Sequence, residues 1–308
     1  MRIAVVGAGG VGGYYGGRLA QAGSDVTFLV RGATLDAMRT NGLRVKSIAG
    51  DFTLDHVNAT DDPSTVGEVD AIVMTVKSWQ LAEAARSLAP MIGRDTAVVP
   101  LENGIEAPEE LAAIVGRDHV LGGLCGIVSF RVAPGHIRHI GAEPTAMFGE
   151  LDHRRTQRVE ALLEAFRRAG IKTDVPPDII RSMWTKFLFI APLSGIGAIT
   201  RVPIGAWRTM PGTRALVERA LHEVIALATA RGIDLGHDAI EKTFARYDGL
   251  TPESTSSLQR DVMEGKPSEL DAQIGAVVRL GRESNVPTPI HEFFYECLLP
   301  QELRAREG

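Results

Sequence analysis

The sequence is poor in cysteine and has no cluster of metal-binding side chains. Its two cysteines, Cys125 and Cys297, are far apart and form no C-x-x-C pair. A disulfide scaffold and a structural zinc site are therefore excluded, and the cysteine usage fits a reducing compartment. The eight histidines show no metal-ligand spacing. We expect a cytoplasmic protein without a metal site.

The sequence also lacks a block of basic residues. Lys and Arg together number 33 and Asp and Glu number 38, which gives a net charge of −5. Proteins that bind nucleic acid neutralise several phosphates with clustered Lys and Arg side chains. We therefore expect no nucleic-acid partner.

No apolar run is long enough to cross a membrane. The uncharged stretch Phe187 to Thr200 has 14 residues and contains Pro192, Gly195 and Gly197. A membrane-spanning helix needs about 20 apolar residues, so this stretch predicts a buried helix followed by a turn. At the N-terminus, glycines follow the short run Ile3 to Val6, unlike a signal peptide. No membrane partner is expected.

What the sequence does contain is the pattern of an α/β protein with two domains. Its 308 residues suffice for about two domains. Up to about residue 175, short apolar runs alternate with amphipathic segments, which predicts βαβ units and a Rossmann-like, doubly wound sheet. After Val175-Pro176-Pro177 only helical patterns follow, so we place the domains at 1–176 and 177–308. Strands are predicted at Ile3–Val6, Asp25–Val30, Ala71–Val76, Thr96–Leu101 and Val120–Val128, and further strands that lengthen the sheet at Leu43–Ser47, Phe52–Leu54, His136–Ile140 and Thr145–Phe148.

Helices are predicted from apolar side chains that recur every three or four residues. Gly170 is expected just beyond the end of the second helix, where glycine is favoured. The predicted helices are Gln80–Met91, Arg154–Ala169, Ile179–Ile190, Gly212–Arg231, Ala239–Tyr247, Thr255–Met263, Glu269–Ser284 and Ile290–Leu299.

A glycine motif directly follows the first predicted strand. Gly7 allows a tight turn, Gly9 lets the backbone approach a pyrophosphate, and Gly12 lets the next helix pack closely on the strand. The helix N-terminus offers N–H groups and partial positive charge to the phosphates. The sequence therefore predicts a dinucleotide site, with cofactor-binding residues Gly7, Ala8, Gly9, Gly10, Val11 and Gly12.

The second predicted strand ends at Arg31, where NAD-dependent enzymes usually carry an acidic residue for the ribose. A guanidinium can make paired hydrogen bonds to the 2′-phosphate of NADP. Asp25 begins this strand and is poorly placed to bind the ribose. We therefore predict NADP as the cofactor, with a solvated surface arginine as the alternative interpretation of Arg31.

Two more polar residues follow strands of the predicted sheet. Lys77 comes after the strand that ends near Val76, and Asn103 comes after the strand that ends at Leu101. Ligands of doubly wound folds bind at this edge of the sheet. Taken singly, Lys77 can be a surface lysine at a helix start, and Asn103 a turn residue.

Taken together, these motifs resemble the ketopantoate reductase (2-dehydropantoate 2-reductase) family. The resemblance implies a Rossmann-like domain joined to a helical domain, and NADPH-dependent reduction of ketopantoate to pantoate in pantothenate biosynthesis. It extends over nearly the whole chain and rests on Gly7-x-Gly9-x-x-Gly12, Arg31, Thr75-Val76-Lys77, Asn103-Gly104, Trp184-x-Lys186, Ser256-Ser257-Leu258-Gln259-Arg260-Asp261 and Pro267-Ser268-Glu269-Leu270-Asp271.

The resemblance implies a role for each matching residue. Lys186 would be the general acid that protonates the ketone oxygen, with Glu269 as its partner and as a contact of the substrate hydroxyl. Ser257 would bind the substrate carboxylate, Asn103 would lie beside nicotinamide and substrate, and Lys77 would line the cofactor side. A snorkelling lysine and a helix-starting glutamate are the structural alternatives for Lys186 and Glu269.

The sequence departs from the family at positions that usually hold polar substrate contacts. Ile190 and Ser194 replace asparagines, and Ile204 replaces a further polar residue. Ser194 remains a candidate substrate-binding residue, whereas isoleucine cannot bind a hydroxyl. The substrate is then ketopantoate in an altered pose or a more apolar 2-oxo acid, and we expect the pocket to tolerate loss of the hydroxyl.

Two other functions remain open: a non-catalytic NADP-binding sensor and a reductase of an unrelated hydroxy acid. Lys186 and Glu269 disfavour the sensor, and the ordered motifs disfavour the unrelated reductase. A homodimer formed through the helical domain is compatible with the sequence, which shows no signature of an interface.

Overall fold

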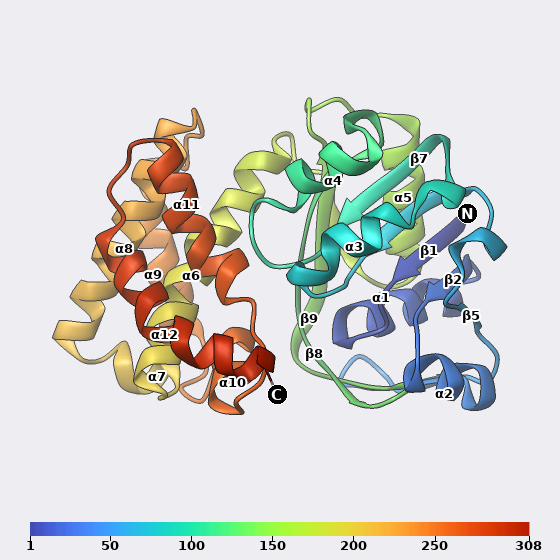
Figure 1. The fold of residues 1–308 in the computed structure, drawn as a ribbon, viewed down its shortest axis with the longest axis horizontal. Helices are drawn as coiled ribbons and strands as arrows, with labels where there is room; N and C mark the ends of the chain where they lie inside the picture. Colours follow the sequence, from blue (N-terminus) through green and yellow to red (C-terminus); the bar gives the residue numbers. More distant parts are fainter. Residues whose placement is uncertain (308) are drawn as a thin grey trace. The chain divides into compact units, whose positions relative to one another are not determined.

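The structure is a computed structural model, which describes residues 1–307. The chain forms two compact units (Figure 1). The first consists of Met1–Glu102 and Ala107–Ile179, and the second of Asn103–Glu106 and the chain from Ile180 onward. The short segment Asn103–Glu106 thus leaves the sheet of the first unit and belongs to the helical unit.

The first unit contains a parallel sheet in the order β5-β2-β1-β6-β7, and four of its strands were predicted. The strand β5 was not predicted, and the predicted strand Val120–Val128 belongs to the second sheet. In the parallel register, Val6 at the end of β1 lies beside Leu29 of β2 and Met74 of β6. The carboxyl ends of these strands therefore meet at one edge. The strands are β1 (Arg2–Val6), β2 (Asp25–Leu29), β5 (Asn58–Thr60), β6 (Val69–Met74) and β7 (Ile92–Pro100).

Both faces of this sheet are covered, as its apolar strands predict. Along β1, Ile3 and Val5 enter one hydrophobic core with helices α1 and α5, whereas Ala4 and Val6 enter another with α3 and α4. Figure 1 shows α3 and α4 over the same face of the sheet. Alternate residues of one strand therefore enter different cores. The helices of this unit are α1 (Gly10–Gln21), α2 (Ala33–Asn41), α3 (Leu81–Arg86), α4 (Ala107–Val115) and α5 (Gln157–Arg168).

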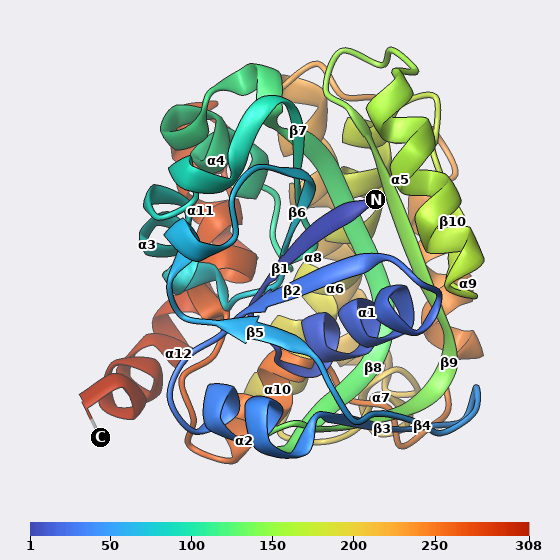
Figure 2. The ribbon, with the colours of Figure 1, turned by 90° about the vertical axis from the view of Figure 1, so that its right-hand side faces the viewer.

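The additional strands build a second sheet, whereas we had predicted that they lengthen the first. This sheet has the order β10-β9-β3-β4, with β8 paired to β9, and a single bridge joins Val98 of the first sheet to Val120. The two long strands β8 and β9 pair with each other as an antiparallel hairpin (Figure 2). The strands are β3 (Leu43–Ser47), β4 (Phe52–Leu54), β8 (Leu121–Ala133), β9 (His136–Glu150) and β10 (Lys172–Asp174).

Helix α1 packs against strands of both sheets through glycines. A Cβ atom on Gly10 would lie 2.3 Å from the carbonyl oxygen of Ser129 in β8, and one on Gly16 would lie 2.5 Å from the ring of Phe28 in β2. No side chain fits at these positions. Gly10, inside the predicted motif, and Gly16, beyond it, therefore allow close packing of this helix on the two sheets.

Helix α6 (Ile179–Thr200) is longer than predicted, because the residues that were expected to end it lie inside it. Gly195 contacts the ring of Phe294, where a Cβ atom would lie only 2.3 Å away. Pro192 removes one backbone hydrogen bond, but Ala191 and Leu193 on either side are buried. Packing therefore outweighs the helix-breaking tendency of these residues.

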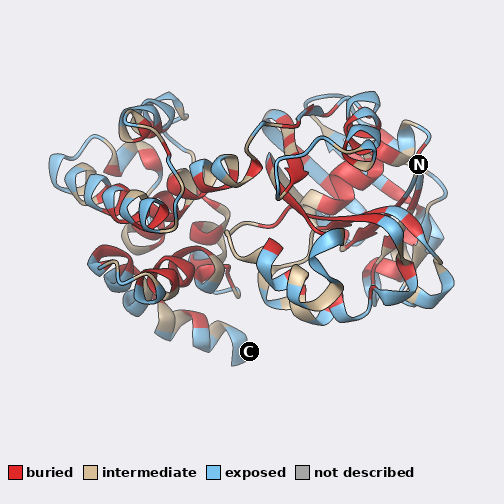
Figure 3. Ribbon diagram, turned by 90° about the horizontal axis from the view of Figure 1, so that it is seen from above, coloured by how far each residue is buried: buried red, intermediate tan, exposed pale blue. Residues whose placement is uncertain are grey.

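By length and composition alone, α6 could cross a membrane. However, 67% of its most apolar window is buried inside the protein, and it forms part of the core of the helical unit. In Figure 3 the helices of this unit carry their buried residues along one side, as amphipathic packing requires.

The other helices largely follow the predicted segments. Helix α5 ends as predicted, with Gly170 at φ = 70°. The Ile171 amide donates to the carbonyl oxygen of Phe166, the bond of a glycine-terminated helix. The predicted helix Gln80–Met91 is shorter, and the helices α2, α4 and α7 were not predicted. The helical unit contains α6, α7 (Ile204–Trp207), α8 (Pro211–Ala230), α9 (Ala239–Gly249), α10 (Ser257–Met263), a π-helical turn (Asp271–Gly275), α11 (Ala276–Glu283) and α12 (Pro289–Glu307).

Candidate functional site

The glycine motif has the geometry that dinucleotide binding requires. Gly7 has φ = 92°, a conformation that side chains disfavour, and its amide donates to the carbonyl oxygen of Leu29 at 3.0 Å. A Cβ atom on Gly12 would lie 2.0 Å from the carbonyl oxygen of Gly7. By contrast, a Cβ atom on Gly9 would have no protein atom within 4 Å. Gly7 and Gly12 are needed by the fold, whereas Gly9 faces open space.

The open space at Gly9 adjoins the N-terminus of α1. Gly9 is the N-cap residue, no side chain caps the helix, and its first turn has no acidic residue. The first N–H groups and the helix dipole are therefore available to an anion. A pyrophosphate fits these features, and the residues from Gly7 to Gly12 are the ones that would hold it.

Thr75 supports this loop and was not identified as a site residue by the sequence analysis. Its hydroxyl lies 2.9 Å from the carbonyl oxygen of Val6 and 2.8 Å from that of Gly7. The hydroxyl fastens the end of β6 to the turn after β1. In the sequence, only the position of Thr75 at the end of a strand could have pointed to this role. The strand register is needed to show that its hydroxyl reaches the carbonyl oxygens of Val6 and Gly7.

Arg31 lies just beyond β2 and forms an ion pair with Glu83 at 3.0 Å. Both side chains are about two-thirds exposed, with values of 67% and 69%. Exposed ion pairs contribute little free energy, so the guanidinium can exchange its partner for a phosphate at small cost. Nearby along the chain, Thr34 in the first turn of α2 accepts a hydrogen bond from Arg131 at 3.0 Å.

Lys77 follows β6 at the same edge of the sheet as the glycine loop. Its ammonium lies 5.6 Å from the centre of the Trp79 ring, within cation–π range. The side chain is half-buried. The strand register thus supports the prediction that Lys77 lies at the ligand-binding edge.

In the helical unit, the structure joins two predicted site residues that are distant in sequence. The Asn103 amide donates to the Glu269 carboxylate at 3.2 Å. The turn after Asn103 requires glycine at position 104. Gly104 has φ = 113°, and a Cβ atom there would lie 2.8 Å from the Ala272 carbonyl oxygen. Segment Asn103–Glu106 is also held by an ion pair between Glu106 and Arg279 at 2.6 Å.

A buried network that the sequence analysis missed holds the residue next to Glu269. Ser268 donates to the Glu302 carboxylate through its hydroxyl at 2.6 Å and through its backbone amide at 3.0 Å. Arg306 lies 2.7 Å from the same carboxylate. Ser268 is fully buried and Glu302 nearly so. Helix α12 therefore fixes the backbone on which Glu269 is mounted, and no local sequence pattern indicates this.

Lys186 is half-buried on α6, and helical spacing places Ile190 and Ser194 on the same face. Within residues 1–307, the Lys186 ammonium makes no hydrogen bond or ion pair, and its pairing with Glu269 stays a prediction. Ser194 is fully buried and donates to Gln273 at 2.9 Å.

Ser257 is the first residue of α10, and its side chain is half-buried. The N-cap of this helix is the neighbouring Ser256, which accepts a hydrogen bond from the Gln259 amide at 3.0 Å. The capping function is thus performed by Ser256, and the hydroxyl of Ser257 is not used for it.

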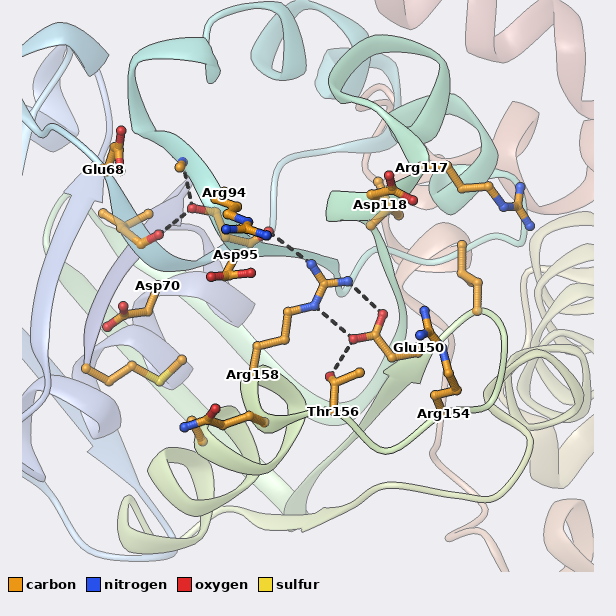
Figure 4. A pocket seen from close by; sticks show the side chains of 18 of the residues that line it. Glu68, Asp70, Arg94, Asp95, Arg117, Asp118, Glu150, Arg154, Thr156 and Arg158 are labelled. Carbon is orange, nitrogen blue, oxygen red and sulfur yellow. Dashed lines mark hydrogen bonds and ion pairs between the residues drawn. The ribbon is translucent and has the colours of Figure 1, made fainter.

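A large charged cavity lies at the opposite, amino-terminal edge of the parallel sheet. Its volume is about 1160 Å³, and none of the predicted site residues lines it. Inside it, Arg158 makes two hydrogen bonds to Glu150, at 2.8 Å and 2.7 Å, and Thr156 donates to the same carboxylate (Figure 4). These bonds tie α5 to the end of β9, which gives this charge cluster a structural role.

The parallel sheet, the glycine loop at its carboxyl edge and the following helical unit define a dinucleotide-dependent oxidoreductase. Comparisons with known proteins identify the family. Residues 3–153 match the family described as ketopantoate reductase PanE/ApbA, and residues 178–302 match its C-terminal domain. The chain belongs to the ketopantoate reductase family.

Individual relatives agree over nearly their whole length. A 2-dehydropantoate 2-reductase of Nostoc is 31% identical over 100% of this chain and 97% of its own. The oxidoreductase YkpB of Bacillus subtilis is 32% identical over 97% and 98%, respectively. The crystal structure of a 2-dehydropantoate 2-reductase from Geobacter metallireducens superimposes with a TM-score of 0.90, at 32% identity and 98% and 99% coverage. The predicted family and fold class are confirmed, and the alternative of a non-catalytic sensor is set aside.

Proposed function

We propose that this protein reduces ketopantoate to pantoate with NADPH, in pantothenate biosynthesis in the cytoplasm. The observation that carries this proposal is the hydrogen bond between Asn103 and Glu269. It assembles two polar groups that the family resemblance assigns to the substrate. Family membership supports reduction of a 2-oxo acid by a nicotinamide cofactor.

The cofactor would be held by residues 1–176 and the substrate by residues 177–308 together with Asn103. The glycine loop from Gly7 to Gly12 would bind the pyrophosphate, and Arg31 would bind the 2′-phosphate. Lys77 would line the cofactor side of the site. When bound, the reduced nicotinamide supplies a hydride to the keto carbon.

Lys186 would donate the proton that the keto oxygen requires as it becomes a hydroxyl. Lys186 is half-buried on a helix, which holds its side chain more precisely than a loop would. Glu269 would orient the substrate hydroxyl, and Ser257 would bind the carboxylate. In this proposal the protein itself would contribute the positioning of the substrate and the proton, and the cofactor would contribute the hydride.

A second candidate substrate is a more apolar 2-oxo acid. Ile204 is almost fully buried and Ile190 is half-buried on the face of α6 that carries Lys186. Apolar side chains at these positions favour a substrate without a hydroxyl.

Loss of NADPH absorbance, measured across a small panel of 2-oxo acids, tests the proposal. We expect the highest kcat/KM with ketopantoate. A higher kcat/KM with 2-oxo-3,3-dimethylbutanoate, its analogue without the hydroxyl, would favour the second candidate. No turnover of any 2-oxo acid would overturn both.

A further inference from the structure

Gln273 is a buried amide one helical turn beyond Glu269. Its backbone amide donates to the Glu269 carbonyl oxygen at 3.1 Å, and its side chain is fully buried, with 0% exposure. It lies in the π-helical turn Asp271–Gly275. Such turns are rare and occur frequently at functional sites.

Only one end of the Gln273 side chain is used by the protein. The Ser194 hydroxyl donates to its oxygen Oε1 at 2.9 Å. Within the described part of the chain, its nitrogen Nε2 has no hydrogen-bond partner. A buried amide nitrogen without an acceptor lowers the stability of a fold. Such groups are rare in native proteins, so this one calls for a functional explanation. With the Ser194 hydroxyl on the oxygen, the nitrogen is the end of the amide that is left to donate.

The surroundings of Gln273 indicate what the nitrogen is for. Lys186 and Ser194 lie two helical turns apart on one face of α6, so the bond to Ser194 sets Gln273 against that face. Glu269, which binds Asn103, precedes Gln273 by one turn. Gln273 is therefore linked by hydrogen bonds to the helix of the proposed acid and to Glu269, the proposed contact of the substrate hydroxyl.

We propose that Nε2 of Gln273 donates a hydrogen bond to a side-chain oxygen of the substrate and thereby selects hydroxylated 2-oxo acids. This inference rests on the proposed function and narrows its substrate class. Ile190 and Ile204 cannot bind a hydroxyl, but the facing π-helical turn supplies an amide that α6 lacks. The preference for the hydroxyl would then come from a residue outside the motifs of α6, and it would replace the tolerance of hydroxyl loss that Ile190 and Ile204 alone predict.

The test compares kcat/KM for ketopantoate and for 2-oxo-3,3-dimethylbutanoate in the wild type and in Gln273→Leu. We expect the wild type to prefer ketopantoate by about 10- to 100-fold, the effect of one buried hydrogen bond. Gln273→Leu should lose about tenfold or more of this preference, mainly through the KM for ketopantoate. Its kcat/KM for the analogue should change by less than about twofold. That substrate is the internal control for folding.

Gln273→Met has an unbranched side chain of similar length and should show the same loss of preference, even if the leucine variant folds poorly. An unchanged preference in a folded variant, or equal losses on both substrates, would overturn the inference and leave the proposed function intact. Equal use of both substrates by the wild type would also overturn it. A wild type that reduces neither compound with NADPH would overturn the proposed function and this inference with it.

Discussion

Substitutions of Gly12 and Gly9 distinguish the effect of the glycine loop on stability from its effect on cofactor binding. In Gly12→Ala, the new Cβ atom would lie 2.0 Å from the Gly7 carbonyl oxygen and 2.2 Å from the Thr75 hydroxyl. Real Cβ atoms keep at least 3.0 Å, so α1 would have to move by about 1 Å. Overpacking of this kind costs about 1–3 kcal/mol, and the movement also displaces the cofactor loop.

Gly9→Ala is the matched variant, because its Cβ atom meets no protein atom within 4 Å and the backbone is extended at φ = −72°. We expect its melting temperature to stay within about 2 °C of the wild type, since alanine tolerates this conformation. The methyl group should nevertheless obstruct the pyrophosphate and weaken NADPH binding by about 1–3 kcal/mol, or roughly 5- to 150-fold.

Differential scanning fluorimetry and NADPH fluorescence titration measure the two effects. Gly12→Ala should lower both the melting temperature and the affinity, whereas Gly9→Ala should lower the affinity alone. If Gly9→Ala binds NADPH as tightly as the wild type, the cofactor does not approach the loop at Gly9 and the interpretation of the motif is wrong.

Three further substitutions test individual residues. Lys186→Ala should lower kcat by roughly 10²- to 10⁴-fold with unchanged NADPH binding, and unchanged turnover would remove Lys186 from the chemistry. Arg31→Ala should raise the KM for NADPH roughly 10- to 100-fold but leave the KM for NADH nearly constant, and equal changes would refute a phosphate contact. Glu302→Gln should release Ser268 and lower kcat by about tenfold, with the KM for NADPH unchanged, because it displaces Glu269. A kcat equal to that of the wild type would show that Glu302 does not position Glu269.

The parallel sheet and the glycine loop could be predicted because they rest on local signals. A strand such as Ile3–Val6 is apolar throughout, and the spacing of Gly7, Gly9 and Gly12 follows from the backbone geometry of one turn. The arrangement of the added strands could not be predicted in the same way. Parallel pairing of β3 with β9, for example Arg44 beside His136, depends on a long-range register that no local pattern encodes.

The length of α6 and the network around Glu269 were missed for a related reason. Proline and glycine usually end helices, but Gly195 lies against Phe294, about 100 residues away in sequence, and only that contact explains it. Likewise, Glu302 and Gln273 carry no motif, and their roles depend on which helix packs against which. Sequence resemblance indicated Lys186 and Glu269, whereas the contacts that hold Glu269 required the structure.

The most direct test of the central claim follows the hydride itself. NADPH labelled with deuterium at the transferred position of the nicotinamide ring would be incubated with ketopantoate and the protein, and the product analysed by mass spectrometry. The account predicts pantoate with one deuterium on the carbon that carried the keto group, formed in the wild type and suppressed in Lys186→Ala. Unlabelled pantoate, or no pantoate from the wild type, would contradict it.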